Sequence, residues 1–187
     1  KQIVLDDGTR FGYDKLAICT GSRVRKLDIK GADLEGIYYL RTVDDVRSIQ
    51  AVIRPKQKAL ILGGGYIGLE MAASLKKIGL SVTLLELAPR LLERVAAPEL
   101  SDFFARIHKE EGINIHCGKT VCSFEYAEDR MIKATCLDGS VYAADLVVVG
   151  VGILPNIELA EEAGLQIQNG IVVDQYARTS DQDIVAA

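Results

Sequence analysis

The feature that most constrains the fold is a short glycine-rich turn between two apolar runs. Residues 59–62 form an apolar run without alternation, as expected for a parallel strand that is covered on both faces. The turn Gly63-Gly64-Gly65-Tyr66-Ile67-Gly68 follows directly, and residues 67–78 then place apolar side chains at helical spacing up to Gly79. A second apolar run, residues 82–85, ends at Glu86. This order predicts a βαβ unit in a parallel α/β sheet.

Three glycines of the turn have different physical roles. Gly63 permits a tight turn, Gly65 lets the backbone approach a ligand, and Gly68 lets the helix pack close to the strand. The start of the helix offers unpaired N–H groups and a positive dipole end, which favour an anion such as a pyrophosphate. Because strand, turn, helix and acid all have the required spacing, the sequence predicts a dinucleotide site. A glycine-rich turn that holds no ligand is the alternative.

Glu86 predicts which dinucleotide is bound. It lies 23 residues after Gly63, where a carboxylate accepts hydrogen bonds from ribose hydroxyls. A carboxylate there also repels a 2′-phosphate, which favours NAD over NADP. Arg90 and Arg94 follow closely and keep NADP open as an alternative, because guanidinium groups bind phosphate.

Composition narrows the class of partner. The 187 residues are 49% hydrophobic, as in a globular protein, and the net charge of −4 argues against nucleic acid or an anionic membrane as the main partner. No apolar run approaches the roughly 20 residues that cross a bilayer. There is no signal-peptide pattern and no initial Met, so we expect a cytoplasmic protein and a fragment.

Cysteines and histidines suggest no metal or redox centre. The sequence has four cysteines, which fit reduced thiols in a cytosolic protein: Cys19, Cys117, Cys122 and Cys136. A redox dithiol of Cys117 and Cys122 is the alternative, but the sequence between them reads as a turn entering a strand. Without a Cys/His cluster at ligand spacing, no zinc site is expected. We expect His108 on the surface or flank of a helix that starts near Pro98.

The remaining elements follow from local signals. Residues 3–5 and 16–19 flank Asp7-Gly8 and predict an antiparallel pair. Thr42 and Asp45 form a capping pair for a helix that ends before Pro55.

Beyond the βαβ unit, the sequence predicts a helix, a meander and a further buried strand. The helix from Pro98 to Gly112 has an expected apolar face of four residues: Leu100, Phe103, Phe104 and Ile107. A strand at 113–117, a meander over 121–142 and a buried strand at 146–150 follow. A short helix and a hairpin at Asn169-Gly170 end the chain.

With these elements in place, the chain resembles the two-dinucleotide-binding flavoprotein oxidoreductases, the FAD-dependent pyridine nucleotide-disulfide oxidoreductase superfamily. More narrowly, it resembles the ferredoxin reductases of bacterial monooxygenase systems. The matching segments span the chain: residues 13–21, 63–70, 88–95, 149–156 and 179–181. The segment 88–95 and the helix after it point to the ferredoxin-reductase branch.

The resemblance implies an α/β fold of the FAD/NAD(P)-binding type: a Rossmann-like parallel sheet with an antiparallel β-meander, flanked by remnants of an FAD domain. Residues 43–152 would form the NADH-binding domain, and residues 1–42 and 153–187 would be pieces of the FAD-binding domain. The first GxGxxG motif of the family is absent and its Gly-Asp flavin motif would follow Ala187, so the fragment is expected not to hold FAD.

The resemblance also implies roles for individual residues. The expected NAD site comprises Gly63, Gly64, Gly65, Tyr66, Ile67, Gly68, Glu70, Glu86, Arg94, Val151 and Gly152. Glu86 would bind the adenosine ribose, Arg94 would lie near the adenosine end, and Tyr66 and Glu70 would lie toward the nicotinamide. Alternatively, Tyr66 is a packing residue and Glu70 a solvated acid. Thr20, Gly21 and Arg23 would lie near FAD, although Val24 replaces the usual proline there.

The activity implied for the parent protein is transfer of hydride from NADH to FAD, and then of electrons to a 2Fe–2S ferredoxin. The cofactors carry this chemistry, so no catalytic side chain is expected. An NADH oxidase or peroxidase is a second hypothesis, and a nucleotide-binding module without activity of its own is a third.

Overall fold

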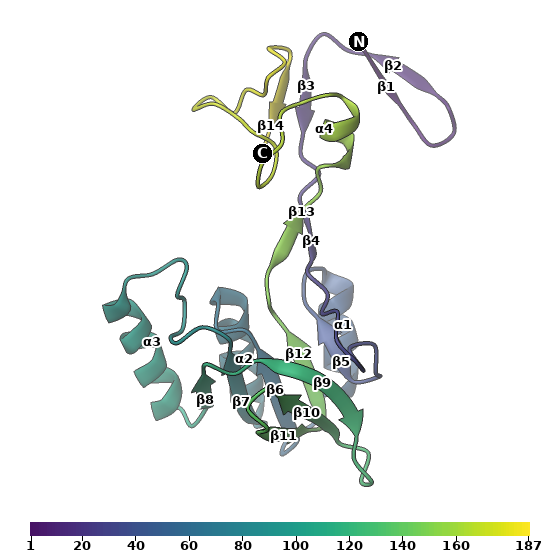
Figure 1. Cartoon of the computed structure of the whole chain (residues 1–187). Helices are drawn as coiled ribbons and strands as arrows, with labels where there is room; N and C mark the ends of the chain where they lie inside the picture. Colours follow the sequence, from purple (N-terminus) through teal and green to yellow (C-terminus); the bar gives the residue numbers. More distant parts are fainter. The chain divides into compact units, whose positions relative to one another are not determined.

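The computed structural model describes residues 1–187 and divides them into two compact units (Figure 1). The central unit is the continuous segment Val24–Gly152, and the flanking unit combines Lys1–Arg23 with Ile153–Ala187. None of the four helices combines the length and the apolar character that a bilayer crossing requires.

The central unit is built on a five-stranded parallel sheet. Its strands, in spatial order, are β5 (Ile37–Tyr39), β12 (Leu146–Val149), β6 (Lys58–Leu62), β7 (Ser81–Glu86) and β8 (Asn114–Cys117). Every neighbouring pair is parallel. This confirms the α/β fold class with its parallel sheet. The apolar runs before Gly63 and before Glu86 are β6 and β7, adjacent in the sheet.

Three helices connect these strands: α1 (Val43–Val52), α2 (Tyr66–Ile78) and α3 (Pro98–Glu110). The predicted capping pair of α1 is confirmed, because Thr42 Oγ1 accepts from the Asp45 N–H and the Asp45 carboxylate accepts from the Thr42 N–H at 2.7 Å. α2 ends at Gly79, whose φ of 100° is the left-handed conformation expected of a glycine cap.

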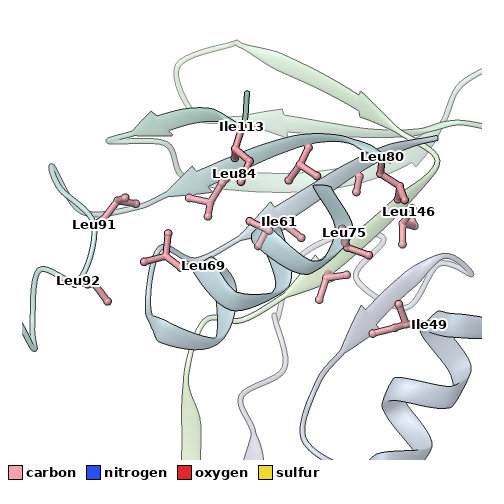
Figure 2. Close-up of a cluster of buried hydrophobic side chains, with 14 residues drawn as sticks. Ile49, Ile61, Leu69, Leu75, Leu80, Leu84, Leu91, Leu92, Ile113 and Leu146 are labelled. Carbon is pink, nitrogen blue, oxygen red and sulfur yellow. The ribbon is translucent and has the colours of Figure 1, made fainter. Parts of the chain in front are cut away.

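Two apolar clusters cover the two faces of the parallel sheet. Figure 2 shows the first, in which Leu69 and Leu75 on α2 lie against Ile61 and Leu84 of the strands. The second packs residues of the same strands, including Leu60, against the meander. Because alternate side chains of each strand meet a different apolar layer, β12 is apolar throughout and β6 is apolar over residues 59–62.

The meander is confirmed as a three-stranded antiparallel sheet. It consists of β9 (Val121–Tyr126), β10 (Ile132–Cys136) and β11 (Val141–Ala144), with β10 in the centre. The register shifts between Thr135 and Cys136. Phe124, Ile132 and Ala134 point into the second cluster and are buried.

The flanking unit contains short paired strands and one short helix, α4 (Glu158–Glu162). β1 (Gln2–Val4) pairs with β2 (Arg10–Gly12), β3 (Leu16–Ile18) with β14 (Ile184–Ala186), and β4 (Ser22–Val24) with β13 (Ile153–Pro155).

The predicted pairing of residues 3–5 with residues 16–19 is wrong. The turn at Asp7-Gly8 closes a short loop through the Leu5 N–H to Thr9 O bond of 2.9 Å, so β1 pairs antiparallel with residues 10–12. β3 instead pairs in parallel with β14, at the far end of the sequence. No local turn signal marks a partner that distant.

The boundary between the two compact units falls between Arg23 and Val24. The division into FAD- and NAD-binding segments that the resemblance implies stays a prediction. Residues 24–42 belong to the central unit because β5 forms the edge of its parallel sheet and because Leu27, Ile29 and Leu34 pack against its second cluster.

Candidate functional site

The glycine turn joins β6 to α2 at the carboxyl edge of the parallel sheet. A Cβ on Gly63 would overlap the carbonyl oxygen of Gly150, and a Cβ on Gly68 would overlap the carbonyl oxygen of Gly63. Gly63 also has a φ of 107°, which L side chains rarely adopt. The packing of the chain itself therefore requires glycine at Gly63 and Gly68.

Gly64 and Gly65 have opposite surroundings. A Cβ on Gly64 would lie 2.5 Å from Leu91 Cδ2 and 3.0 Å from Glu86 Oε2, whereas a Cβ on Gly65 would meet nothing within 4 Å. Gly65 is the N-cap residue of α2, with φ −80° and no side-chain cap. Neither packing nor backbone conformation demands glycine there. The open space fits an anionic group drawn to the unpaired N–H groups of the helix start.

Glu86, at the end of β7, is hydrogen-bonded to the glycine turn. Its Oε2 accepts a hydrogen bond from the Gly64 N–H, and its Oε1 accepts one from the Ala88 N–H at 2.7 Å. A carboxylate has about four lone-pair directions, so Glu86 still has acceptor capacity for hydroxyl groups. It is only partly buried, which leaves that capacity accessible.

The loop after β7 is anchored on the glycine turn. The Leu92 N–H donates to Gly64 O at 2.9 Å, and Leu91 packs over Gly64. Leu92 is buried and has a φ of 53°, an uncommon conformation for a residue with a side chain. The backbone is therefore strained at Leu92, where the loop is hydrogen-bonded to the turn.

Arg90 holds this loop together and is not free for a phosphate. Its Nε lies 2.6 Å from Glu93 Oε2, and its Nη1 donates to Ala96 O and to Ser101 Oγ. Ser101 is buried and donates in turn to Leu91 O. The sequence offered Arg90 as a phosphate ligand, but its donors are committed to the loop.

The side chain of Arg94 extends from the loop after β7 toward Gly152. It is exposed, and its terminal Nη2 lies 4.0 Å from where a Cβ on Gly152 would be. Val151 N lies 3.5 Å from the Cβ position of Gly63, so the segment after β12 borders the glycine turn. The structure thus brings Arg94, Val151 and Gly152 beside the turn.

Tyr66, Ile67 and Glu70 lie on the first turns of α2. Tyr66 is 52% exposed and Ile67 is 40% exposed. Glu70 is exposed as well. The exposure of Tyr66 disfavours its interpretation as a packing residue and leaves its ring available to a ligand or another chain.

Thr20, Gly21 and Arg23 lie in the flanking unit. Thr20 and Asn156 bind reciprocally, Thr20 Oγ1 to Asn156 O at 2.6 Å and Asn156 Nδ2 to Thr20 O at 2.8 Å. Thr20 and Gly21 line a hollow of about 380 Å³ together with residues near the C-terminus. Arg23 binds Asn156 Oδ1 and Glu158, each at 2.7 Å.

The expected position of His108 is wrong. It is 8% exposed, with Nδ1 2.9 Å from Phe104 O and Nε2 3.3 Å from Leu69 O on α2. The buried side of α3 therefore runs through Ser101, Phe104 and His108. The polar residues Ser101 and His108 were missed because an apolar pattern does not reveal satisfied polar groups in a core.

Part of the expected apolar face of α3 is also wrong. Leu100 and Phe103 are 42% and 46% exposed, so the face is rotated away from these two side chains.

Comparison with known proteins agrees with this geometry. The model of the pyridine nucleotide-disulphide oxidoreductase family matches residues 1–187. The chain belongs to this family. It is 42% identical to putidaredoxin reductase CamA of Pseudomonas putida and 40% identical to rhodocoxin reductase of Rhodococcus erythropolis. Both alignments cover all of this chain but only 45% and 44% of the relatives, so the chain spans under half their length.

Solved structures of related oxidoreductases also match this chain. The covalent putidaredoxin reductase–putidaredoxin complex matches with a TM-score of 0.90 at 42% identity, covering 99% of this chain and 46% of that chain. The water-forming NADH oxidase of Lactobacillus brevis, solved with NADH, matches with a TM-score of 0.84 at 27% identity, covering 95% and 39%. These findings confirm the fold class and the resemblance to the ferredoxin-reductase branch.

Proposed function

We propose that the central unit binds NAD(H) at the Gly63–Gly68 turn, as part of an FAD-dependent ferredoxin reductase. The observation that carries this proposal is the open space around Gly65 at the start of α2. Gly63 and Gly68 are explained by contacts within the chain, but Gly65 is not. A backbone that is bare at this one position suits the close approach of a pyrophosphate.

Different residues of the site would bind different parts of the dinucleotide. The turn from Gly63 to Gly68 would face the pyrophosphate, and Glu86 would accept hydrogen bonds from the adenosine ribose. Val151 and Gly152 would border the groove on the β12 side. Tyr66 and Glu70, exposed on α2, would lie toward the nicotinamide, which supplies the hydride when the cofactor is bound.

Glu86 supports NAD over NADP. Its carboxylate opposes a 2′-phosphate, and Arg90 is held by Glu93 and Ser101 and does not counter that charge. A variant of the NADH oxidase, engineered to use NADPH, replaces an aspartate by alanine and introduces two arginines. That change follows the same electrostatic rule.

For the longer protein we propose electron transfer from NADH through FAD to a 2Fe–2S ferredoxin. The similarity to putidaredoxin reductase and rhodocoxin reductase supports this, as does the match to the complex with putidaredoxin. The hollow beside Thr20 and Gly21 would border FAD, and Arg23 would hold Asn156 in place at its edge.

An oxidase of the NADH-oxidase type is a second candidate, since such a structure shares the fold at 27% identity. The higher identity to ferredoxin reductases favours the first. Residues 1–187 alone are proposed to bind NADH without turnover. Adding NADH, free FAD and an artificial electron acceptor tests this, and sustained NADH oxidation would contradict it.

Titration of NADH and NADPH into the wild-type chain and the Glu86→Gln variant tests the binding site. A glutamine amide loses part of the acceptor capacity and the negative charge. We expect the preference for NADH over NADPH to fall by about tenfold, equivalent to about 1.4 kcal/mol. The ratio is the readout because Glu86 also supports the turn, and a general loosening would weaken both ligands alike. An unchanged ratio would remove Glu86 from this role.

A further inference from the structure

Two arginine side chains of the central unit converge on Gly152. Arg25 Nε and Arg94 Nη2 each lie 4.0 Å from the Cβ position of Gly152, and apart from Gly152 and its two chain neighbours no other residue comes as near to that point. Arg25 follows β4, whereas Arg94 comes from the loop after β7, so two separate segments supply the pair. Arg25 was not singled out in the sequence.

Hydrogen bonds hold the segments that carry Arg25 and Arg94 in place. The Arg25 N–H donates to Gly152 O at 3.0 Å, which ties this segment to the end of β12. Arg94 follows Arg90, whose bonds to Glu93, Ala96 and Ser101 fold the loop. Gly152 itself has a φ of 114° and no side chain, so no Cβ occupies the point near which both guanidinium groups lie.

The two cations have no counter-charge of their own. Neighbouring arginines in the sequence are paired, Arg23 with Glu158 and Arg90 with Glu93. The structure gives the side chains of Arg25 and Arg94 no hydrogen bond and no ion pair. Two atoms 4.0 Å from one point are at most twice that far apart, within the Debye length of about 8 Å at physiological salt. The pair therefore repels unless an anion joins it.

The sheet order indicates which anion. In the sheet, β6 lies between β12 and β7. Arg94 is in the loop that follows β7, and its side chain ends beside Gly152, which follows β12. The Arg94 side chain therefore passes the carboxyl end of β6, where the glycine turn begins. Glu86 lies on the β7 side, where the ribose is proposed. We infer that Arg25 and Arg94 form a clamp for the pyrophosphate of the dinucleotide. This inference rests on the proposed function and extends it to Arg25.

Calorimetric titration of NADH and NADPH into four variants of the full chain tests the clamp. Arg25→Gln and Arg94→Gln should each weaken both dinucleotides by about tenfold, because the pyrophosphate is common to both. Arg25→Lys should keep part of the affinity. Arg106→Gln is the matched control; it removes one exposed arginine from α3, where Arg106 pairs with Glu110, and should leave both affinities unchanged. Since all three arginines are exposed, the thermal unfolding midpoint should stay constant.

These titrations distinguish a failure of the arginine clamp from a failure of dinucleotide binding itself. A loss for NADPH alone would assign the arginines to the 2′-phosphate and overturn the clamp. Unchanged affinity for both dinucleotides in Arg25→Gln and Arg94→Gln would overturn it as well. If the wild-type chain binds neither NADH nor NADPH, the proposed function fails, and the clamp fails with it.

Discussion

The two units of this chain differ in how they bury apolar side chains. The central unit covers both faces of its sheet, and Ile61, Leu84 and Val147 are fully buried. The flanking unit has one small cluster around Ile18 and Leu165, and every residue of its β1–β2 hairpin is exposed.

The central unit is therefore the part of the chain that its own apolar core stabilises. The central unit is one continuous segment whose strands and helices bury each other, whereas the flanking unit joins two segments distant in sequence. A lone two-stranded hairpin is marginal in water. The glycine turn therefore sits on a rigid scaffold, and the flanking unit has apolar residues such as Phe11 left uncovered.

The largest expected contrast is in hydrogen exchange. Amides of β6 and β12 open only with the global unfolding of the central unit, so we expect protection of at least about 10³-fold there. Amides of β1 and β2 should exchange nearly as fast as in a free peptide. Mass spectrometry of the same sample measures both regions. Equal protection of β1 and β6 would contradict the comparison.

Core truncation should follow the same division. Ile61→Ala removes a fully buried side chain and should cost about 2–5 kcal/mol in the free energy of unfolding. Phe11→Ala truncates a larger side chain that is 54% exposed, and should change it by no more than about 0.5 kcal/mol. Urea unfolding checks the pair, and similar losses in both variants would refute the assignment of the core.

Within the central unit, two glycines of one turn should respond differently to alanine. Gly68→Ala forces a Cβ into Gly63 O and should destabilise by about 3 kcal/mol. Gly65→Ala places its Cβ in open space and should cost about 1 kcal/mol or less, the usual effect at an N-cap. Thermal unfolding of both variants gives the order, and a reversed order would show that the turn is packed differently.

The smallest expected effect is a pH dependence in the flanking unit. Lys1 and Lys15 lower the pKa of Asp183 from 3.8 to about 2. A lowered carboxyl pKa stabilises the fold above pH 3.8, and the contribution is lost as the pH falls toward 2. The protection factors of the amides around Ile184, which correct for the intrinsic pH dependence of exchange, should fall over this window. Asp183→Asn should reduce the pH dependence and leave the part that comes from Asp181, whose pKa is lowered by its hydrogen bond from Lys1. An unchanged profile in that variant would contradict the assignment.

The sequence was sufficient for the parallel sheet, because uninterrupted apolar runs and a glycine turn are local signals with strict spacing. It failed for β3, whose partner β14 lies at the other end of the chain. It also failed for His108, whose ring binds two backbone carbonyls inside the core. At the site, Glu86 could be singled out by its spacing. Arg25 could not, because only the folded chain brings it to Gly152.

We propose that the turn leaves space at Gly65 for a dinucleotide. Calorimetric titration of NADH into the wild-type chain and Gly65→Val tests it most directly, with Gly12→Val in the flanking unit as the matched control. We predict binding by the wild-type chain and by Gly12→Val, and at least about a tenfold loss of NADH affinity in Gly65→Val, with an unfolding midpoint lowered by no more than about 4 °C. Equal NADH affinity in Gly65→Val and the wild-type chain would contradict it.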